Sequence, residues 1–265
     1  LSTAQIVSLT TGQATALSST SVKALSAAQL GAMETADLAV LGSTNMATLS
    51  STQVRGLTTT QLSGLTTTAL SQLNTGALAG LTTTQIVSLT TAQVAGLTSA
   101  SVKVLSTAQL GAMETEDVAV LSSTNLAALS SLQVQALTTG QIVGLTTDQI
   151  SNLNTVTLQA LSVKQIAALE RGDVSLLGSS KIAALSSTQL RALNTAQIAE
   201  LTSAQLSSLG ATLLSQLNSS QLSGLSTSDL NDLASATLGA LTSAQVAGLS
   251  TDQVASLTTT ALSYL

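Results

Sequence analysis

The feature that most constrains this chain is a period of eight residues that runs through it without a change of phase. Counting from Leu1 in steps of eight gives 33 complete octads, and Leu265 begins another. An unbroken short period is typical of a solenoid, in which each repeat stacks on its neighbours. We therefore predict a single uninterrupted array of octapeptide repeats over residues 1–265 instead of a set of globular domains.

Two positions of the octad are apolar. Position 1 is Leu in 31 octads and Met in the other two, and position 6 is Ile, Val, Leu or Met in 32. No charged residue occupies either position. We predict that these two positions form a thin layered core, represented in the middle of the array by Leu81, Ile86, Leu89, Val94 and Leu97.

This spacing excludes both a continuous helix and a continuous strand. Eight residues at about 100° each leave a drift of roughly 80° per repeat, so the apolar pair would wind around a helix. In a strand, positions 1 and 6 would point to opposite faces because they differ by an odd number. The backbone must therefore turn once in every octad.

Positions 2 to 5 indicate how the chain turns. Position 2 is Ser or Thr in 22 octads, and position 5 is Gln in 18. Ser or Thr followed three residues later by Gln is the capping-box pattern, in which the two residues cap the start of a helix reciprocally. Thr90 with Gln93 and Ser106 with Gln109 are examples. The pattern predicts one short helix over positions 3 to 8 of each octad.

Such a helix cannot be stable alone. It spans roughly 10 Å at 1.5 Å per residue, and isolated helices of this length are marginal in water. Burying two aliphatic side chains contributes roughly 3–6 kcal/mol, less than the cost of ordering eight backbones at about 1–2 kcal/mol each. We predict an elongated all-α solenoid, in which three or four octads close a coil. The alternative is a β-solenoid, because Thr, Val and Ile favour strands.

Composition argues against several classes of function. The net charge is −5, and the chain has neither a basic patch nor an aromatic surface for stacking bases, since Tyr264 is its one aromatic residue, so we predict no nucleic-acid binding. Every octad carries polar residues, so we predict no membrane span. The chain has no His and no Cys, the usual bases, nucleophiles and soft metal ligands. We predict neither enzymatic activity nor a cofactor.

Two features allow more specific hypotheses. Glu114, Glu116 and Asp117 cluster in one octad, where acidic residues complement the helix dipole. The alternative is a calcium site, since carboxylate oxygens suit that ion. Runs of Thr at 58–60, 66–68 and 82–84 are interpreted as caps and first-turn residues. The alternative is a surface-binding module, with rows of Thr facing ice, glycan or mineral.

The repeated run L-[ST]-[ST]-A-Q-[IV]-x-x-L resembles the octapeptide arrays of very large secreted or surface proteins of Gram-negative bacteria, often labelled as adhesins. The resemblance implies an extracellular or cell-surface location and a structural or adhesive role. It transfers no functional residue, because the repeats match one another and not a site.

We expect a structural repeat protein, a subunit or segment of an extracellular filament, surface layer or adhesin stalk. The first octad is complete, the last residue restarts the repeat, and neither end has a polar cap. We therefore expect the ends either to continue into further chain or to stack on another copy.

Overall fold

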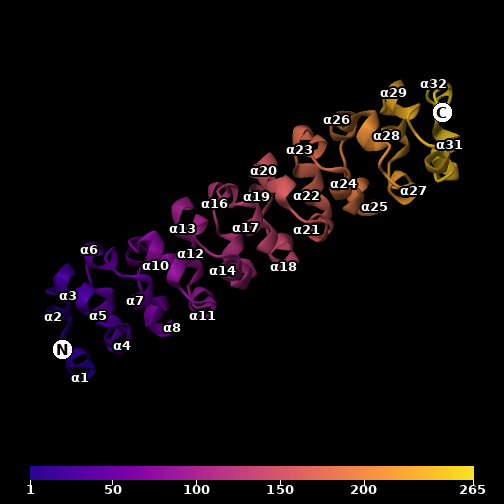
Figure 1. The fold of residues 1–265 in the computed structure, drawn as a ribbon. Coiled ribbons are helices and arrows are strands. Elements are labelled where there is room, and N and C mark those ends of the chain that lie inside the picture. The colour runs from indigo at the N-terminus through magenta and orange to yellow at the C-terminus, as the bar shows by residue number, and fades with distance from the viewer. The chain divides into compact units, whose positions relative to one another are not determined.

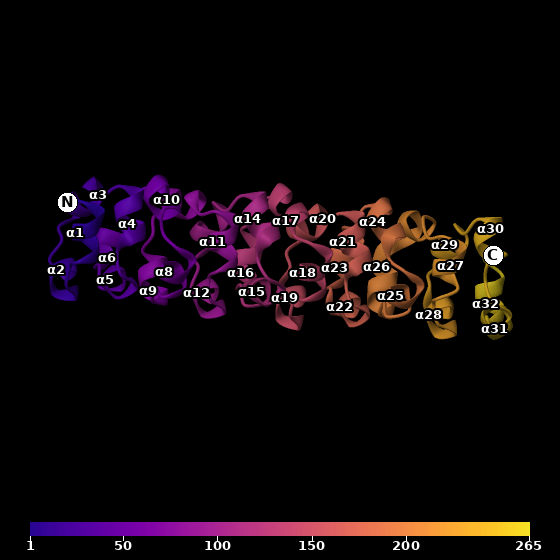
Figure 2. The same cartoon turned by 90° about the horizontal axis from the view of Figure 1, so that it is seen from below.

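A computed structural model describes residues 1–265 and contains 32 α-helices and no strand (Figures 1 and 2). The all-α prediction is confirmed, and the β-solenoid alternative is wrong. The chain divides into unit 1, Leu1–Leu137, and unit 2, Thr138–Leu265. The octad period continues from one unit into the other in the same phase.

The helices of unit 1 are α1 (Thr3–Val7), α2 (Thr11–Thr15), α3 (Ser19–Ala24), α4 (Ala27–Ala32), α5 (Thr35–Ala39), α6 (Ser43–Met46), α7 (Ser51–Arg55), α8 (Thr59–Ser63), α9 (Thr67–Ser71), α10 (Thr75–Gly80), α11 (Thr83–Val87), α12 (Thr91–Ala95), α13 (Ser99–Lys103), α14 (Thr107–Ala112), α15 (Thr115–Ala119), α16 (Ser123–Ala127) and α17 (Ser131–Ala136).

The helices of unit 2 are α18 (Thr139–Val143), α19 (Thr147–Asn152), α20 (Thr155–Ala160), α21 (Val163–Ala168), α22 (Arg171–Leu176), α23 (Ser179–Ala183), α24 (Ser187–Ala192), α25 (Thr195–Ile198), α26 (Ser203–Leu214), α27 (Ser219–Leu222), α28 (Thr227–Asp232), α29 (Ser235–Leu238), α30 (Ser243–Val246), α31 (Thr251–Ser256) and α32 (Thr259–Leu262).

Each of these helices begins at position 3 of an octad, directly after a cap at position 2. Thr82, the cap of α11, shows why. Its backbone is extended, with φ −76° and ψ 161°, and its hydroxyl accepts a hydrogen bond from the N–H of Gln85. The cap therefore turns the chain and satisfies a helical N–H that has no partner inside the helix.

Three octads form one coil in each unit. In unit 1, α1 packs on α4, α4 on α7 and α7 on α10, and parallel rows begin with α2 and α3. In unit 2, α18 packs on α21 and α21 on α24, while α19 packs on α22 and α22 on α25. Side chains at equivalent positions of successive coils are thus three octads apart in the sequence.

The core lies at positions 1, 5 and 6. Leu81, Ile86, Leu89, Val94 and Leu97 are each at most 6% exposed. The residues at position 5 are buried as well, for example Gln85 and Gln93, which are 4% and 2% exposed. The sequence pattern led us to expect only positions 1 and 6 inside. The burial of a row of polar amides is the main difference from that expectation.

One octad departs from the pattern. In residues 209–216, Gly210 stands at the cap position and Leu213 replaces the glutamine. Here α26 runs from Ser203 to Leu214 across two octads, and Gly210 alone breaks the helical geometry with φ 64° and ψ 173°. A positive φ is readily available only to glycine, so Gly210 makes the turn that the N-cap residue makes in other octads.

Candidate functional site: an amide ladder between coils

The glutamine at position 5 caps the start of its own helix. In α12, the backbone N–H of Thr90 donates to Oε1 of Gln93 at 2.8 Å, and the N–H of Gln93 donates to the Thr90 hydroxyl at 3.3 Å. In α14, Ser106 and Gln109 make the same two bonds at 2.7 and 3.2 Å. Both pairs form complete capping boxes.

The other end of the same side chain reaches the preceding coil. Nε2 of Gln93 donates to the carbonyl of Leu65 at 2.7 Å and to that of Leu62 at 2.8 Å. Nε2 of Gln109 donates to the carbonyl of Leu81 at 2.7 Å. Leu62 lies in the last turn of α8, Leu65 lies just after its end, and Leu81 is the C-terminal cap of α10, so these carbonyls belong to helix ends, where carbonyls lack intrahelical partners. One amide therefore caps the N-terminus of its helix and the C-terminus of a helix one coil earlier.

We name this set of bonds the amide ladder, defined as a hydrogen bond from a position-5 side-chain nitrogen to the position-1 carbonyl 28 residues earlier. Its glutamine members include Gln53, Gln61, Gln85, Gln93, Gln109 and Gln133 in unit 1, and Gln189, Gln197, Gln205, Gln221, Gln245 and Gln253 in unit 2.

A shorter amide also reaches. Nδ2 of Asn45 donates to the carbonyl of Leu17 at 2.8 Å, and Nδ2 of Asn125 donates to that of Leu97 at 2.9 Å. In α10, where position 5 is alanine, Asn74 at the cap position donates to the carbonyl of Leu49 at 2.8 Å. In these three octads an asparagine therefore keeps the ladder bond where the glutamine is absent.

The composition of position 5 contains a signal for this role. A capping box accepts Glu as well as Gln, because only a side-chain oxygen is needed. Yet position 5 holds 18 Gln and no Glu. Glutamate has no N–H to donate to the preceding coil. The exclusion of Glu could have revealed the ladder from the sequence.

Adjacent coils approach closely beside the ladder. A Cβ added at Gly80 would lie 2.5 Å from the Ser51 Cβ, and one added at Gly56 would lie 2.5 Å from the Ala27 carbonyl oxygen. Each pair joins position 8 of one coil to position 3 of the coil before it. Glycine at these places lets the backbones come within hydrogen-bonding distance of the ladder.

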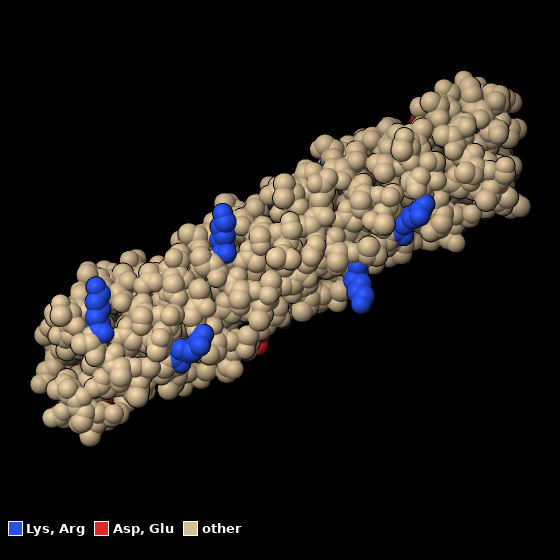
Figure 3. Space-filling model, in the orientation of Figure 1, with Lys and Arg blue, Asp and Glu red and all other residues tan.

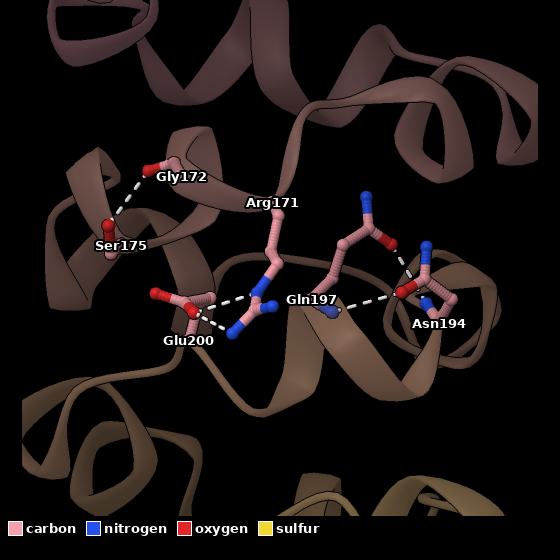
Figure 4. A network of polar contacts seen from close by, with 6 residues as sticks. All are labelled: Arg171, Gly172, Ser175, Asn194, Gln197 and Glu200. Atoms are coloured by element: carbon pink, nitrogen blue, oxygen red, sulfur yellow. Dashed lines mark hydrogen bonds and ion pairs between the residues drawn. The ribbon is translucent and has the colours of Figure 1, made fainter.

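Figure 4 shows the same pair of positions occupied by charges in unit 2. Arg171 in α22 forms an ion pair with Glu200, which follows α25 in the next coil, and its Nε lies 2.8 Å from Oε1. Beside it, Asn194 and Gln197 exchange the two capping-box bonds at 2.8 and 3.0 Å. The arginine side chain is 63% exposed, so water screens this pair strongly.

The predicted calcium ligands do not come together. Glu114 and Glu116 are exposed, whereas Asp117 is buried against the preceding coil. No group of three or more Asp, Glu, His or Cys side chains is arranged to hold a metal ion. Figure 3 shows one face, on which the few Lys and Arg are separated by uncharged surface. The Thr runs at 58–60, 66–68 and 82–84 are exposed throughout.

Two buried aspartates have perturbed acidity. Burial raises the pKa of Asp117 above its ordinary 3.8, Glu114 and Glu116 add to the rise, and a hydrogen bond from Thr91 opposes it. Burial also raises the pKa of Asp173, with Glu170 adding to the rise and the backbone N–H of Glu170 opposing it. Both residues stand at position 5, the place of the ladder glutamines.

Neither unit contains a pocket. No helix of this chain combines the length and the apolar character needed to cross a bilayer. The described residues therefore offer surfaces and the faces of coils, not a cleft, to any partner.

Comparison with known proteins identifies the repeat. No functionally curated protein matches the sequence. The ALTTAQ repeat matches residues 30–67, 91–123, 110–147, 166–203, 174–211 and 224–259. These matches cover more than half of the chain and include both units. The chain therefore belongs to the ALTTAQ repeat family.

Proposed function

We propose that this chain is a structural repeat protein that associates with itself end to end, as a subunit or segment of an extracellular filament, a surface layer or an adhesin stalk. The observation that carries the proposal is the polarity of the amide ladder. Within each unit, position-5 amides donate to the coil before them, and position-1 carbonyls accept from the coil after them. The two faces of a coil are therefore complementary to each other.

Groups of both kinds also occur in the first and last coils of the described residues, where a further coil, of this chain or of a second copy, would meet them. Gln5 and Gln13 are exposed, and their Oε1 atoms accept the cap N–H groups at 2.7 and 2.9 Å. Their Nε2 atoms have no protein partner. In the last coil, the carbonyls of Leu249 and Leu257 receive no hydrogen bond. These are the same donors and acceptors that join coils inside each unit, so another coil from any source satisfies them.

The test replaces the donors without changing the caps. In Gln5→Glu/Gln13→Glu, the carboxylates still accept the cap N–H groups but offer no N–H to a second copy. Ala4→Glu/Gly12→Glu is the matched control, since it adds the same two charges at exposed positions of α1 and α2. Each protein is examined over a concentration series by negative-stain electron microscopy and sedimentation velocity.

We expect filaments of constant width from the native protein and the control, with a sedimentation coefficient that rises with concentration. The Gln5→Glu/Gln13→Glu protein should remain monomeric. Single particles of the native protein at every concentration would contradict self-association. Filaments from the double glutamate variant would show that association uses another surface.

We propose an extracellular or cell-surface location on two grounds. The chain has no cysteine, so its fold is independent of the redox state of its compartment. Its surface is dominated by uncharged Ser, Thr and Ala, as expected for a passive structural element. Protease treatment of intact source cells, followed by detection with an antibody, tests this location. Degradation of the protein supports it, and full protection contradicts it.

A second candidate function is binding to a regular surface such as ice, glycan or mineral. One row of unit 1 favours it, because position 3 is threonine in every helix of that row except the last, namely Thr11, Thr35, Thr59, Thr83 and Thr107, with Ser131 at its end, whereas the neighbouring row mixes Ser and Thr. Thr59→Val/Thr83→Val should abolish thermal hysteresis or glycan-array binding, while Thr67→Val/Thr91→Val in a neighbouring row should not. Background signals from the native protein would exclude this candidate.

A further inference from the structure

Position 5 is aspartate in four octads, where the amide ladder has no amide donor; three of these aspartates are buried and the fourth, Asp229, is half-buried. Asp37, Asp117 and Asp173 are 1%, 2% and 5% exposed, so they occupy the same buried place as the glutamines. An ionised carboxylate accepts hydrogen bonds and cannot donate one. At these three steps, the ionised side chain therefore leaves the preceding coil without its donor.

The length of the side chain is sufficient for the missing bond. Asn45 and Asn125 have the same heavy-atom skeleton as aspartate, and both donate across coils at 2.8 and 2.9 Å. A protonated aspartate carries an O–H where asparagine carries an N–H. Proton uptake from solvent is thus the only change needed for Asp37 to become a donor like Asn45.

Asp37 lies where a protonated carboxyl group could take the place of an asparagine amide. Its Oδ2 is buried and has no hydrogen-bond partner. The carbonyl of Leu9, which is 28 residues earlier and corresponds to the acceptor of every other ladder bond, receives no hydrogen bond. A buried polar oxygen without a partner lowers the stability of the fold, and a hydrogen bond to it removes that cost. Donor and acceptor positions are both present, and only the proton is missing.

Asp173 occupies the equivalent position in unit 2. The backbone N–H of Glu170 donates to its Oδ2 at 2.9 Å, as a cap N–H donates to the glutamine Oε1 elsewhere. The carbonyl of Leu145, again 28 residues earlier, receives no hydrogen bond. Burial raises the pKa of Asp173, and Glu170 adds to the rise. Asp117 differs from both, because a hydroxyl of the preceding coil, that of Thr91, already serves its carboxylate.

The charged groups around the two sites are few. Asp37 shares α5 with Glu34 at its cap, and neither α2 nor α8, which pack on α5, carries an ionisable side chain. Asp173 shares α22 with its cap Glu170 and with Arg171, which pairs with Glu200 beyond α25. The packed helix α19 contributes Asp148, an exposed residue. No free cation stabilises the ionised form of either aspartate.

We propose that Asp37 and Asp173 form hydrogen bonds between coils when they are protonated. On protonation, each donates its O–H to the position-1 carbonyl of the preceding coil, Leu9 for Asp37 and Leu145 for Asp173. Acidification therefore completes the ladder at steps that are open at neutral pH. The array is more firmly coupled along its length in acid than at neutrality.

The direction in which pH changes stability through Asp173 follows from the raised pKa of this residue. The folded protein binds the proton more tightly than the unfolded chain does, so stability rises as the pH falls through the folded pKa. The gain is complete below the ordinary value of 3.8 and is absent well above the folded pKa. Most carboxylates that are paired in the folded state have the opposite effect, because acid removes their stabilisation.

The test compares the native protein with Asp37→Asn/Asp173→Asn, which installs permanent donors of the same shape. Asp252→Asn is the control, because it removes the same type of charge from an exposed residue of α31. Thermal unfolding is measured at about pH 7.5 and about pH 2, on either side of the ordinary aspartate range. Carbon-13 NMR of labelled aspartate carboxyls, assigned through the Asn variants, follows protonation of Asp173 directly.

At neutral pH, we expect the Asn variant to melt higher than the native protein by about 2–4 °C per site. At acid pH the two should melt together, and Asp173 should titrate above the ordinary aspartate value of 3.8. The control should melt like the native protein at both pH values. An Asn variant with no advantage at neutral pH, or a constant advantage at both pH values, would overturn the proposal. So would an Asp173 carboxyl that titrates at or below the ordinary value of 3.8.

Discussion

Octads 81–88 and 209–216 bury the same apolar pair but differ at every position that marks the start of a helix. Leu81 and Ile86 are 3% and 1% exposed, and Leu209 and Leu214 are 4% and 1% exposed. The first octad has Thr82 and Gln85, and its helix begins at its own cap. The second has neither a capping hydroxyl nor a glutamine, and its helix continues from the previous octad through Gly210.

The difference separates two tasks within one repeat. The residues at positions 1 and 6 are sufficient to bury the octad in its coil, because both octads achieve this. The residues at positions 2 and 5 help to mark where one helix stops and the next begins. In octad 209–216 both are lost, and the helix continues until Gly210 makes the turn, whereas octad 233–240, with Ala234 and Thr237 at these positions, still begins its own helix.

The largest effect should come from the shared core. Ile86→Ala and Leu214→Ala each remove a fully buried side chain, and we expect each to lower the free energy of unfolding by about 2–5 kcal/mol. Urea denaturation measures both. If the apolar pair performs the same task in the two octads, the losses should be similar. A loss of stability at Leu214 that is less than a quarter of the loss at Ile86 would contradict the claim that the apolar pair has the same role in both octads.

The next largest effect should come from converting the regular octad into the irregular one. Gln85→Leu removes the bond to the cap N–H at 2.9 Å and the two cross-coil bonds to Val54 and Leu57, both at 2.8 Å. Because these groups become buried without partners, we expect a loss of about 2–4 kcal/mol. Gln5→Leu is the control, since Gln5 is exposed and only caps its own helix.

We expect Gln5→Leu to cost about 1 kcal/mol, the usual value of a cap. Hydrogen exchange should show faster exchange at α11 in the Gln85 variant. Equal losses at Gln85 and Gln5 would mean that the cross-coil bonds add nothing to the cap.

A smaller effect should come from the glycine that replaces the cap. Gly210→Ala places a side chain at a positive φ, at an expected cost of about 1–2 kcal/mol. Gly12→Ala is the matched control, because Gly12 lies within α2 and an added Cβ there meets nothing within 4 Å. It should be neutral or slightly stabilising. Thermal unfolding distinguishes the two, and an equal response would show that the turn does not depend on glycine.

The smallest effect should come from the exposed ion pair. Arg171→Ala should change the free energy of unfolding by less than about 1 kcal/mol, because both side chains of the pair are accessible to water. The difference from the native protein should disappear at high salt. A larger loss of stability that persists at high salt would mean that this exposed ion pair holds coils together as strongly as the buried amides do.

Much of each octad was predictable because its causes are local. The pairing of Thr90 with Gln93 and the burial of Ile86 follow from residues within one octad of each other. The partner of the glutamine Nε2 was not predictable in this way. Leu65 lies three octads before Gln93, and that number depends on the angle through which the chain turns at each cap. The eight-residue period is compatible with three or four octads per coil.

The aspartates were harder still to interpret. From the sequence, Asp117 belongs to an acidic cluster with Glu114 and Glu116, and a cluster of carboxylates suggests a cation. Its burial against Thr91 of the preceding coil depends on the same coil size. The charge pattern was visible in the sequence, but the surroundings of each charge required the fold.

The central claim is that coils of three octads are joined through position 5, and a disulfide tests the coil size most directly. The Cβ of Thr67 lies 3.6 Å from a Cβ built on Gly96, within the range that a disulfide spans, and the chain has no native cysteine. We predict that Thr67→Cys/Gly96→Cys oxidises readily in native conditions and that Thr59→Cys/Gly96→Cys does not. Coils of four octads would bring position 59 beside position 96. Oxidation of the second pair but not the first would therefore contradict the account.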